Sequence, residues 1–329
     1  MNSSKQRNYY IDLLKLILAI IVALGHFGVE LIINAGFAVS VFFMISGYYI
    51  AKHAYSKRED VCSYMRNRIR KVFPEYLISF LVLLFLKLAV SLIRENIDII
   101  NVVRYIINVI PEALLLQGLG FASETVNPTM WFMSVWMIAS GFIYVIIKNM
   151  RKNILLPIMP FFIIFSFVII GHQRDPWGLI GGVLYLPLFR GFVTMIIGVG
   201  IYFIEPIFIQ IREEKKIVVF TVSIVMCFII RNSNDCYLIF AASALLYIFT
   251  IHKTEIPNKY LKILSYCGIV SEKIYYWHYC FLIVLNTMFK TANITSKLIS
   301  GGVYLTSIVS FAVICAYIQK NKSLFSRKF

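Results

Sequence analysis

The sequence predicts an all-α membrane protein, a polytopic helix bundle with about ten transmembrane helices and with both termini in the cytoplasm. Of its 329 residues, 60% are hydrophobic and only 15% are charged, too few charges to cover a soluble protein of this size. Apolar runs of about 17 to 22 residues recur along the chain, and a helix of that length crosses a hydrocarbon core of ~30 Å. The basic residues gather between alternate runs, as cytoplasmic loops require.

The apolar runs predict ten spans that fill nearly the whole chain. Their approximate bounds are 11–30, 35–52, 74–93, 130–148, 154–171, 189–209, 217–231, 236–252, 274–290 and 297–318. The first run is too long for a signal-peptide core and lacks a small-x-small cleavage site, which predicts a retained helix. Since no linker, repeat or low-complexity tract divides the chain, we expect residues 1–329 to form one domain ending in a short basic cytoplasmic tail at about 319–329.

The chain is strongly basic, with 32 Lys and Arg against 16 Asp and Glu and a net charge of +16. In a soluble protein this excess would suggest a nucleic acid or another polyanion, whereas here its placement indicates topology. With the N-terminus inside, the basic clusters fall in cytoplasmic segments, at 5–7, 52–71, 148–152, 212–216, 253–273 and 320–328. We therefore expect a multi-pass protein of the cell (plasma or inner) membrane that contacts membrane lipid and binds no nucleic acid.

Two outer segments are long. Residues 94–129 mix acidic and basic side chains, and their stretch 99–116 is amphipathic, which predicts that it lies at the membrane surface or re-enters it. Residues 171–187 are rich in glycine and polar groups and suit contacts rather than spanning. The six cysteines show no CxxC or metal-ligand spacing, so neither a disulfide framework nor a metal site is expected.

The first span carries four ionisable residues, Asp12, Lys15, His26 and Glu30. Such residues are costly inside a membrane and are functional candidates by default. Lys15 and His26 are eleven residues apart, which is about three turns, so they share one helix face ~16 Å apart. The functional interpretation is that Lys15 contacts an anionic cofactor and His26 transfers a proton. The alternative is that Lys15 snorkels to the headgroups and His26 sits at the interface.

A basic run, Arg66, Arg68, Arg70 and Lys71, precedes Pro74 on the cytoplasmic side. Arg68 and Lys71 lie three residues apart and therefore share a helix face. Such a cluster most often marks topology or contacts anionic lipid. It would also hold the phosphates of a nucleotide-like cofactor.

The order of these motifs resembles the acyltransferase-3 family of integral membrane O-acyltransferases. The resemblance rests on Lys15-x10-His26, then FFMISG at 42–47, then Arg68-x-x-Lys71-x-x-Pro74-x-Tyr76. Further agreement comes from WFMSV at 131–135, LFRGFVTMIIGVG around Arg190, and IYYWHY at 274–279. The similarity runs from residue 10 to about 318.

The resemblance implies transfer of an acyl group, usually acetyl from cytoplasmic acetyl-CoA, to a hydroxyl of a cell-envelope or capsular polysaccharide or its lipid-linked precursor. In these terms His26 is the expected catalytic base, with Glu30 to orient it. Direct transfer and an acyl-histidine intermediate both remain open. The expected donor-binding residues are Lys15, Arg66, Arg68, Arg70, Lys71 and His278, and the expected acceptor-binding residues are Trp131, Ser134 and Arg190.

Several of these residues have simpler interpretations. His278, near the start of the expected ninth span, would otherwise belong to an aromatic interface belt, Arg190 would be a snorkelling cation, and Trp131 would be an interface anchor. The chain also departs from the family at two places. Lys15 stands where the family has arginine, and Trp136 and Met137 stand where many members have two glutamates, so an acidic contribution would have to come from Glu30 or Asp12.

Two other classes of function compete with the enzyme. A transporter or flippase would place its charges near the midplane of matched halves, whereas this chain concentrates them in one N-terminal stripe and a cytoplasmic turn, which favours the enzyme. A degenerate member that only moves glycan or assembles with envelope proteins is the third hypothesis. A homo-oligomer or a complex with glycan-assembly proteins is compatible with each.

Overall fold

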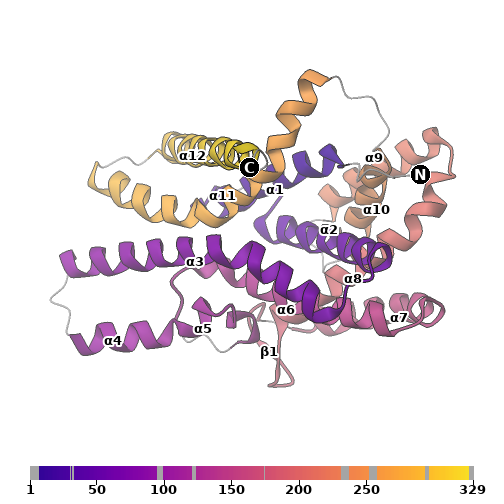
Figure 1. The fold of residues 1–329 in the computed structure, drawn as a ribbon, viewed down its shortest axis with the longest axis horizontal. Helices are drawn as coiled ribbons and strands as arrows, with labels where there is room; N and C mark the ends of the chain where they lie inside the picture. The colour runs from indigo at the N-terminus through magenta and orange to yellow at the C-terminus, as the bar shows by residue number, and fades with distance from the viewer. Residues whose placement is uncertain are drawn as a thin grey trace.

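The computed structural model describes residues 7–29, 31, 33–94, 99–120, 124–173, 175–230, 237–251, 258–292 and 296–325. Long helices make up most of this part of the chain (Figure 1). They are α1 (Tyr9–Phe27), α2 (Ala35–Ser56), α3 (Val61–Arg94), α6 (Trp131–Asn149), α7 (Lys152–Gly171), α8 (Leu186–Ile209), α9 (Glu213–Ile229), α10 (Tyr237–Thr250), α11 (Asn258–Thr291) and α12 (Lys297–Phe325).

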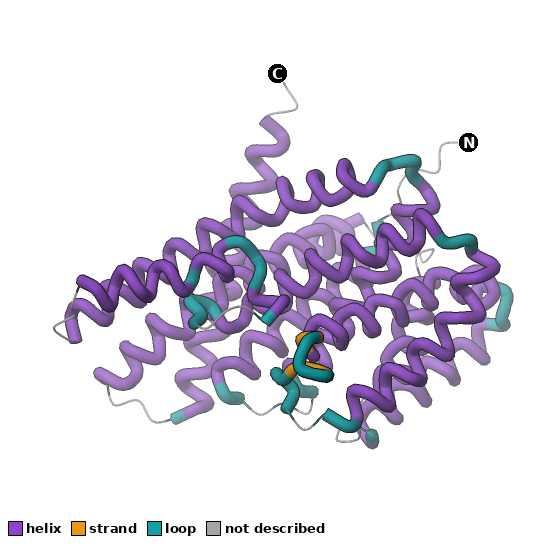
Figure 2. The backbone as a smooth tube through the Cα atoms, turned by 90° about the horizontal axis from the view of Figure 1, so that it is seen from below, coloured by secondary structure: helices purple, strands orange, loops and turns teal. Residues whose placement is uncertain are grey.

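Shorter elements lie in the two long connections. Between α3 and α6 come α4 (Ile99–Asn108), α5 (Ile110–Ala113) and the 3-10 turns η1 (Gln117–Leu119) and η2 (Pro128–Met130). Between α7 and α8, strands β1 (Leu179–Ile180) and β2 (Leu184–Tyr185) form a small antiparallel hairpin, drawn in orange in Figure 2.

The all-α, multi-pass class predicted from hydropathy is confirmed. In the part of the chain that the structure describes, seven helices are long and apolar enough to cross a membrane, namely α1, α2, α3, α6, α7, α8 and α12. The other three expected spans fall on α9 and α10, which have 17 and 14 residues, and on α11, which carries several charges along its length. Each of the ten expected spans thus coincides with one helix, and the count of ten crossings stays a prediction.

Two helices begin earlier than the apolar runs indicate. Helix α3 starts at Val61 rather than near Pro74, and α11 starts at Asn258 rather than near residue 274. Hydropathy marks only the part of a helix that suits lipid, whereas a helix can continue into a polar region when its charges find partners. Lys273 on α11 supplies one such case, because its ammonium pairs with the carboxylate of Glu75 on α3.

A close helix contact explains one glycine of α2 and one of α8. Helix α2 packs along α8, and α1 packs along α11. A Cβ atom added to Gly47 would lie 1.9 Å from the Met195 carbonyl oxygen, and one added to Gly198 would lie 2.0 Å from the Met44 carbonyl oxygen. The two backbones therefore approach at a distance that only glycine permits.

The segment between α3 and α6 returns to the body of the bundle. Helix α4 covers most of the predicted amphipathic stretch and buries none of its side chains. Beyond α4, Val109, Glu112 and Leu115 are buried, and the Tyr76 hydroxyl on α3 donates a hydrogen bond to the Glu112 carbonyl. The segment is therefore held on α3 and α6.

Candidate functional site

A polar cavity of about 360 Å³ lies where α2, α3 and α6 meet. Ligand pockets usually measure about 300 to 1,000 Å³, so this cavity has room for part of a large cofactor. Its lining combines cations, aromatic rings and one carboxylate, contributed by Tyr49, His53, Lys57, Glu59, Tyr64, Asn67, Arg68, Lys71, Val72 and Trp136. The C-terminal part of α2, the start of α3 and the middle of α6 therefore form one site.

Arg68 is held between two aromatic rings. Its guanidinium carbon lies 4.0 Å from the ring centre of Trp136 and 5.0 Å from that of Tyr64, and the Arg68 Nη1 donates a hydrogen bond to the Tyr64 hydroxyl. Trp136 is fixed in turn, because its indole Nε1 donates to the Ser46 hydroxyl at 2.8 Å. The Nε atom of Arg68 is buried and has no hydrogen-bond partner among the described residues. A rigid guanidinium with an unused buried donor fits an anionic ligand.

The structure divides the basic run into two groups. Arg68 and Lys71 line the cavity, as their shared helix face predicts, whereas Arg66 and Arg70 are exposed and do not line it. Lys15 on α1 lies beside the same site. Its ammonium is 5.3 Å from the ring centre of Tyr49, which lines the cavity, and its charge repels that of Lys71.

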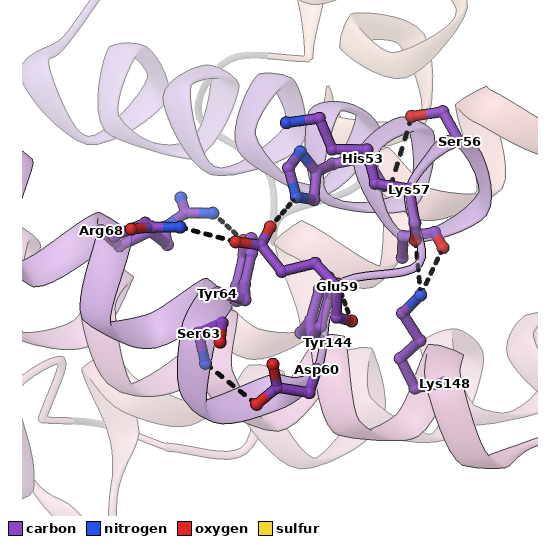
Figure 3. A network of polar contacts seen from close by, with 12 residues as sticks. His53, Ser56, Lys57, Glu59, Asp60, Ser63, Tyr64, Arg68, Tyr144 and Lys148 are labelled. Carbon is purple, nitrogen blue, oxygen red and sulfur yellow. Dashed lines mark hydrogen bonds and ion pairs between the residues drawn. The ribbon is translucent and has the colours of Figure 1, made fainter.

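The carboxylate of Glu59 reaches into this cationic cavity. Figure 3 shows it beside His53, whose Nε2 lies 2.6 Å from one carboxylate oxygen, and the amide of Asn67 donates to the other at 2.6 Å. The hydrogen bond with His53 holds the pKa of Glu59 below its usual range. The sequence assigns no role to His53 or Glu59. Their spacing does not show that the chain turns between them and brings the Glu59 carboxylate to both His53 and Asn67.

The second feature is a pair of stacked histidines. The rings of His26 on α1 and His278 on α11 are parallel to within 29°, with centroids 5.4 Å apart. His278 is 1% exposed, and its Nδ1 lies 2.8 Å from the Tyr275 carbonyl oxygen, so this nitrogen carries the proton. Its Nε2 is left as a buried acceptor without a partner among the described residues. His26 itself is exposed.

The structure places His278 away from the cavity around Arg68. The sequence predicts it at the cytoplasmic start of a span, near the donor, whereas α11 begins at Asn258, twenty residues before it. The longer helix carries His278 along the bundle to the end of α1, where it meets His26 and not the cavity around Arg68.

Of the two acidic candidates for a partner of His26, the structure describes one. Glu30 lies outside the described residues. Asp12 is buried at the other end of α1 and pairs with Arg7. Another buried carboxylate was missed by sequence reasoning, that of Glu112, which accepts hydrogen bonds from the backbone of Val126 and Asn127 at 2.5 and 2.7 Å. Burial outweighs these bonds and raises the pKa of Glu112 to about 7.

The three expected acceptor residues differ in their surroundings. Trp131 meets Trp177 from the α7–α8 connection edge to face, with ring centres 5.2 Å apart. Arg190 is half-buried in the first turns of α8. Ser134 is fully buried, donates to the Leu115 carbonyl and accepts from the Gly118 amide, so its hydroxyl holds the α3–α6 segment on α6. Both hydrogen bonds of the Ser134 hydroxyl are thus used within the protein, and its role toward an acceptor stays a prediction.

These features define a class of protein, a multi-pass helical bundle with a cationic cavity and a histidine pair connected by its first helix. The sequence profile of the acyltransferase-3 family, described as an acyltransferase domain, matches residues 8–318, nearly the whole chain. The chain therefore belongs to the acyltransferase-3 family and is a membrane acyltransferase. No curated protein and no solved structure is significantly similar to it.

Proposed function

We propose that this enzyme transfers acetyl from cytoplasmic acetyl-CoA to a hydroxyl of a cell-envelope or capsular polysaccharide or its lipid-linked precursor. The observation that carries the proposal is the buried Arg68 guanidinium with an unused donor, in a cavity that also presents Lys71. CoA is a polyanion, and charge-assisted hydrogen bonds from arginine are among the strongest contacts with phosphate.

Lys15 connects the donor site with the histidine pair. It lies beside the cavity through Tyr49 and shares α1 with His26, ~16 Å further along the axis. A donor whose phosphates bind Arg68 and Lys71 would extend its thioester arm along α1 toward His26. The acyl group would then meet an acceptor that approaches from the opposite end of the bundle, where Trp131 and Trp177 are in contact.

In the proposed chemistry His26 acts as the general base. Its neutral ring takes the proton of the acceptor hydroxyl while the hydroxyl oxygen attacks the thioester carbonyl carbon. The C–S bond then breaks, the ester forms, and the proton passes from His26 to the departing CoA thiolate. His278 acts as a positioning residue, because its ring stacks on His26 and is itself fixed by the Tyr275 carbonyl.

The test compares surface glycans of a strain that lacks this gene after complementation with different variants. Ester-linked acyl groups are measured by NMR before and after mild base. We expect wild type and His172→Ala to restore them, because His172 lies in an outer turn away from the histidine pair, and His26→Ala to lose them at equal protein level.

Substantial ester content with His26→Ala would refute the role of this histidine. An unchanged ester content in the deletion strain, together with missing surface glycan, would instead indicate transport. Purified wild-type protein that neither binds CoA nor releases it from acetyl-CoA with an acceptor glycan would refute the donor.

A further inference from the structure

The lining of the polar cavity contains a built anion site that is filled by a residue of the chain itself. His53 and Asn67 both hydrogen-bond to the Glu59 carboxylate, each at 2.6 Å and each to a different oxygen. Lys57 adds a positive charge that acts on the same carboxylate. Two short bonds and a neighbouring cation are what a phosphate group also requires.

We infer that His53 and Asn67 form a phosphate subsite for the acyl donor, and that Glu59 occupies this subsite as a competing anion when no donor is bound. The inference rests on the proposed function, since it assigns one part of the donor to one part of the same cavity. It adds residues from α2 and α3 that the basic run does not include.

The geometry allows the exchange of one anion for the other. Glu59 lies in the short connection between α2 and α3 rather than within a helix, and its side chain is 18% exposed. Its backbone is held independently, because the Tyr144 hydroxyl donates to the Glu59 carbonyl at 2.9 Å. The carboxylate can therefore swing into water while the connection keeps its position, and His53 and Asn67 then present their donors to a phosphate.

Glu59 also offsets part of the positive charge of the cavity. Lys57, Arg68 and Lys71 line it beside the histidine, and Glu59 is the one acidic residue in the lining that the structure describes. A carboxylate that remains in the cavity would repel a bound donor, and donors with more phosphate charge would displace it more readily. Glu59 would thus favour a highly charged donor over weakly charged anions.

The test measures CoA binding to the purified full-length protein in nanodiscs of zwitterionic lipid, by isothermal titration calorimetry. Glu59→Gln keeps the size of the side chain and removes its charge, so we expect the Kd for CoA to fall about three- to tenfold. Asp60→Asn is the matched control, because the adjacent Asp60 is exposed and its carboxylate accepts from the Ser63 amide at the start of α3 instead of entering the cavity.

A double variant separates a built subsite from a general effect of charge. Adding His53→Ala to Glu59→Gln should cancel the gain if His53 contacts the phosphate. Repeating the titration with dephospho-CoA places the contact, since a gain that disappears assigns the subsite to the 3′-phosphate and one that persists assigns it to the diphosphate.

Three results would overturn the inference. The first is an equal change in Kd for Glu59→Gln and Asp60→Asn, and the second is weaker binding by Glu59→Gln. The third is a gain in affinity that Glu59→Gln shows only for phosphatidylglycerol included in the nanodiscs and not for CoA. That result would assign the subsite to a lipid headgroup. In each case wild-type binding of CoA would leave the proposed function standing, whereas no CoA binding by any variant would overturn both.

Discussion

Arg68 differs from the other basic residues of its run in what surrounds its guanidinium. It lies between Trp136 and Tyr64, while Arg66 and Arg70 are exposed. The Trp136 ring keeps the cation rigid without neutralising it, and the charge of Arg68 stays available to a donor phosphate.

Replacing Arg68 should therefore weaken donor binding far more than replacing its neighbour. We expect Arg68→Ala to raise the Kd for CoA by about ten- to a hundredfold, the loss of one charge-assisted hydrogen bond from a buried site. Arg70→Ala, which removes the same charge from the exposed face, serves as the control and should change the Kd by less than about threefold. Equal losses in the two variants would show that the cluster attracts the donor only through its net charge.

At the scale of single elements, the close contact with α8 fixes α2, one of the helices that line the cavity. Gly47 and Gly198 allow the two backbones to touch, and α2 carries His53 and the start of the connection to Glu59. A side chain at the contact would push the helices apart and move these cavity residues. The glycines thus matter for function through position and not through chemistry.

The Gly198→Ala variant tests this contact. Its added methyl group would meet the Met44 carbonyl, which is backbone and cannot rotate aside, so we expect a loss of about 1 to 3 kcal/mol in the free energy of unfolding and a lower Tm in detergent. Gly302→Ala on α12 is the control, because nothing lies within 4 Å of its added Cβ. Equal Tm values for the two variants would contradict the tight packing of α2 on α8.

For the whole molecule, the orientation in the membrane decides which substrate reaches which site. The proposed function requires the cavity at the α2–α3 connection to face the cytoplasm and the α7–α8 hairpin to face outward. The excess of basic residues in the predicted cytoplasmic segments supports this orientation.

Labelling of single cysteines tests the orientation. In a cysteine-free background, Cys62 restored near the start of α3 should react with a membrane-impermeant maleimide only after cells are permeabilised. Val183→Cys in the hairpin turn, where the native side chain is 86% exposed, should react in intact cells. The opposite pattern would place the cationic cavity outside and rule out a cytoplasmic donor.

The sequence by itself determined the class of fold, the family, the ionisable residues of the first helix and the cations of the basic run. Hydropathy and charge are local properties, so runs of apolar residues and alternating basic segments predict spans without knowledge of their neighbours. The i,i+3 spacing of Arg68 and Lys71 is also local, and the structure confirms that the two line one cavity.

Only the tertiary structure decided which of these residues meet. The pairing of His26 with His278 depends on how far α11 extends before it packs on α1. The hydrogen bonds of His53 and Asn67 to Glu59 depend on the turn between α2 and α3. Ser134 shows the same limit, since its burial follows from the way the α3–α6 segment folds back onto α6. Contacts between residues far apart in the chain arise from packing, and packing is a property of the whole bundle.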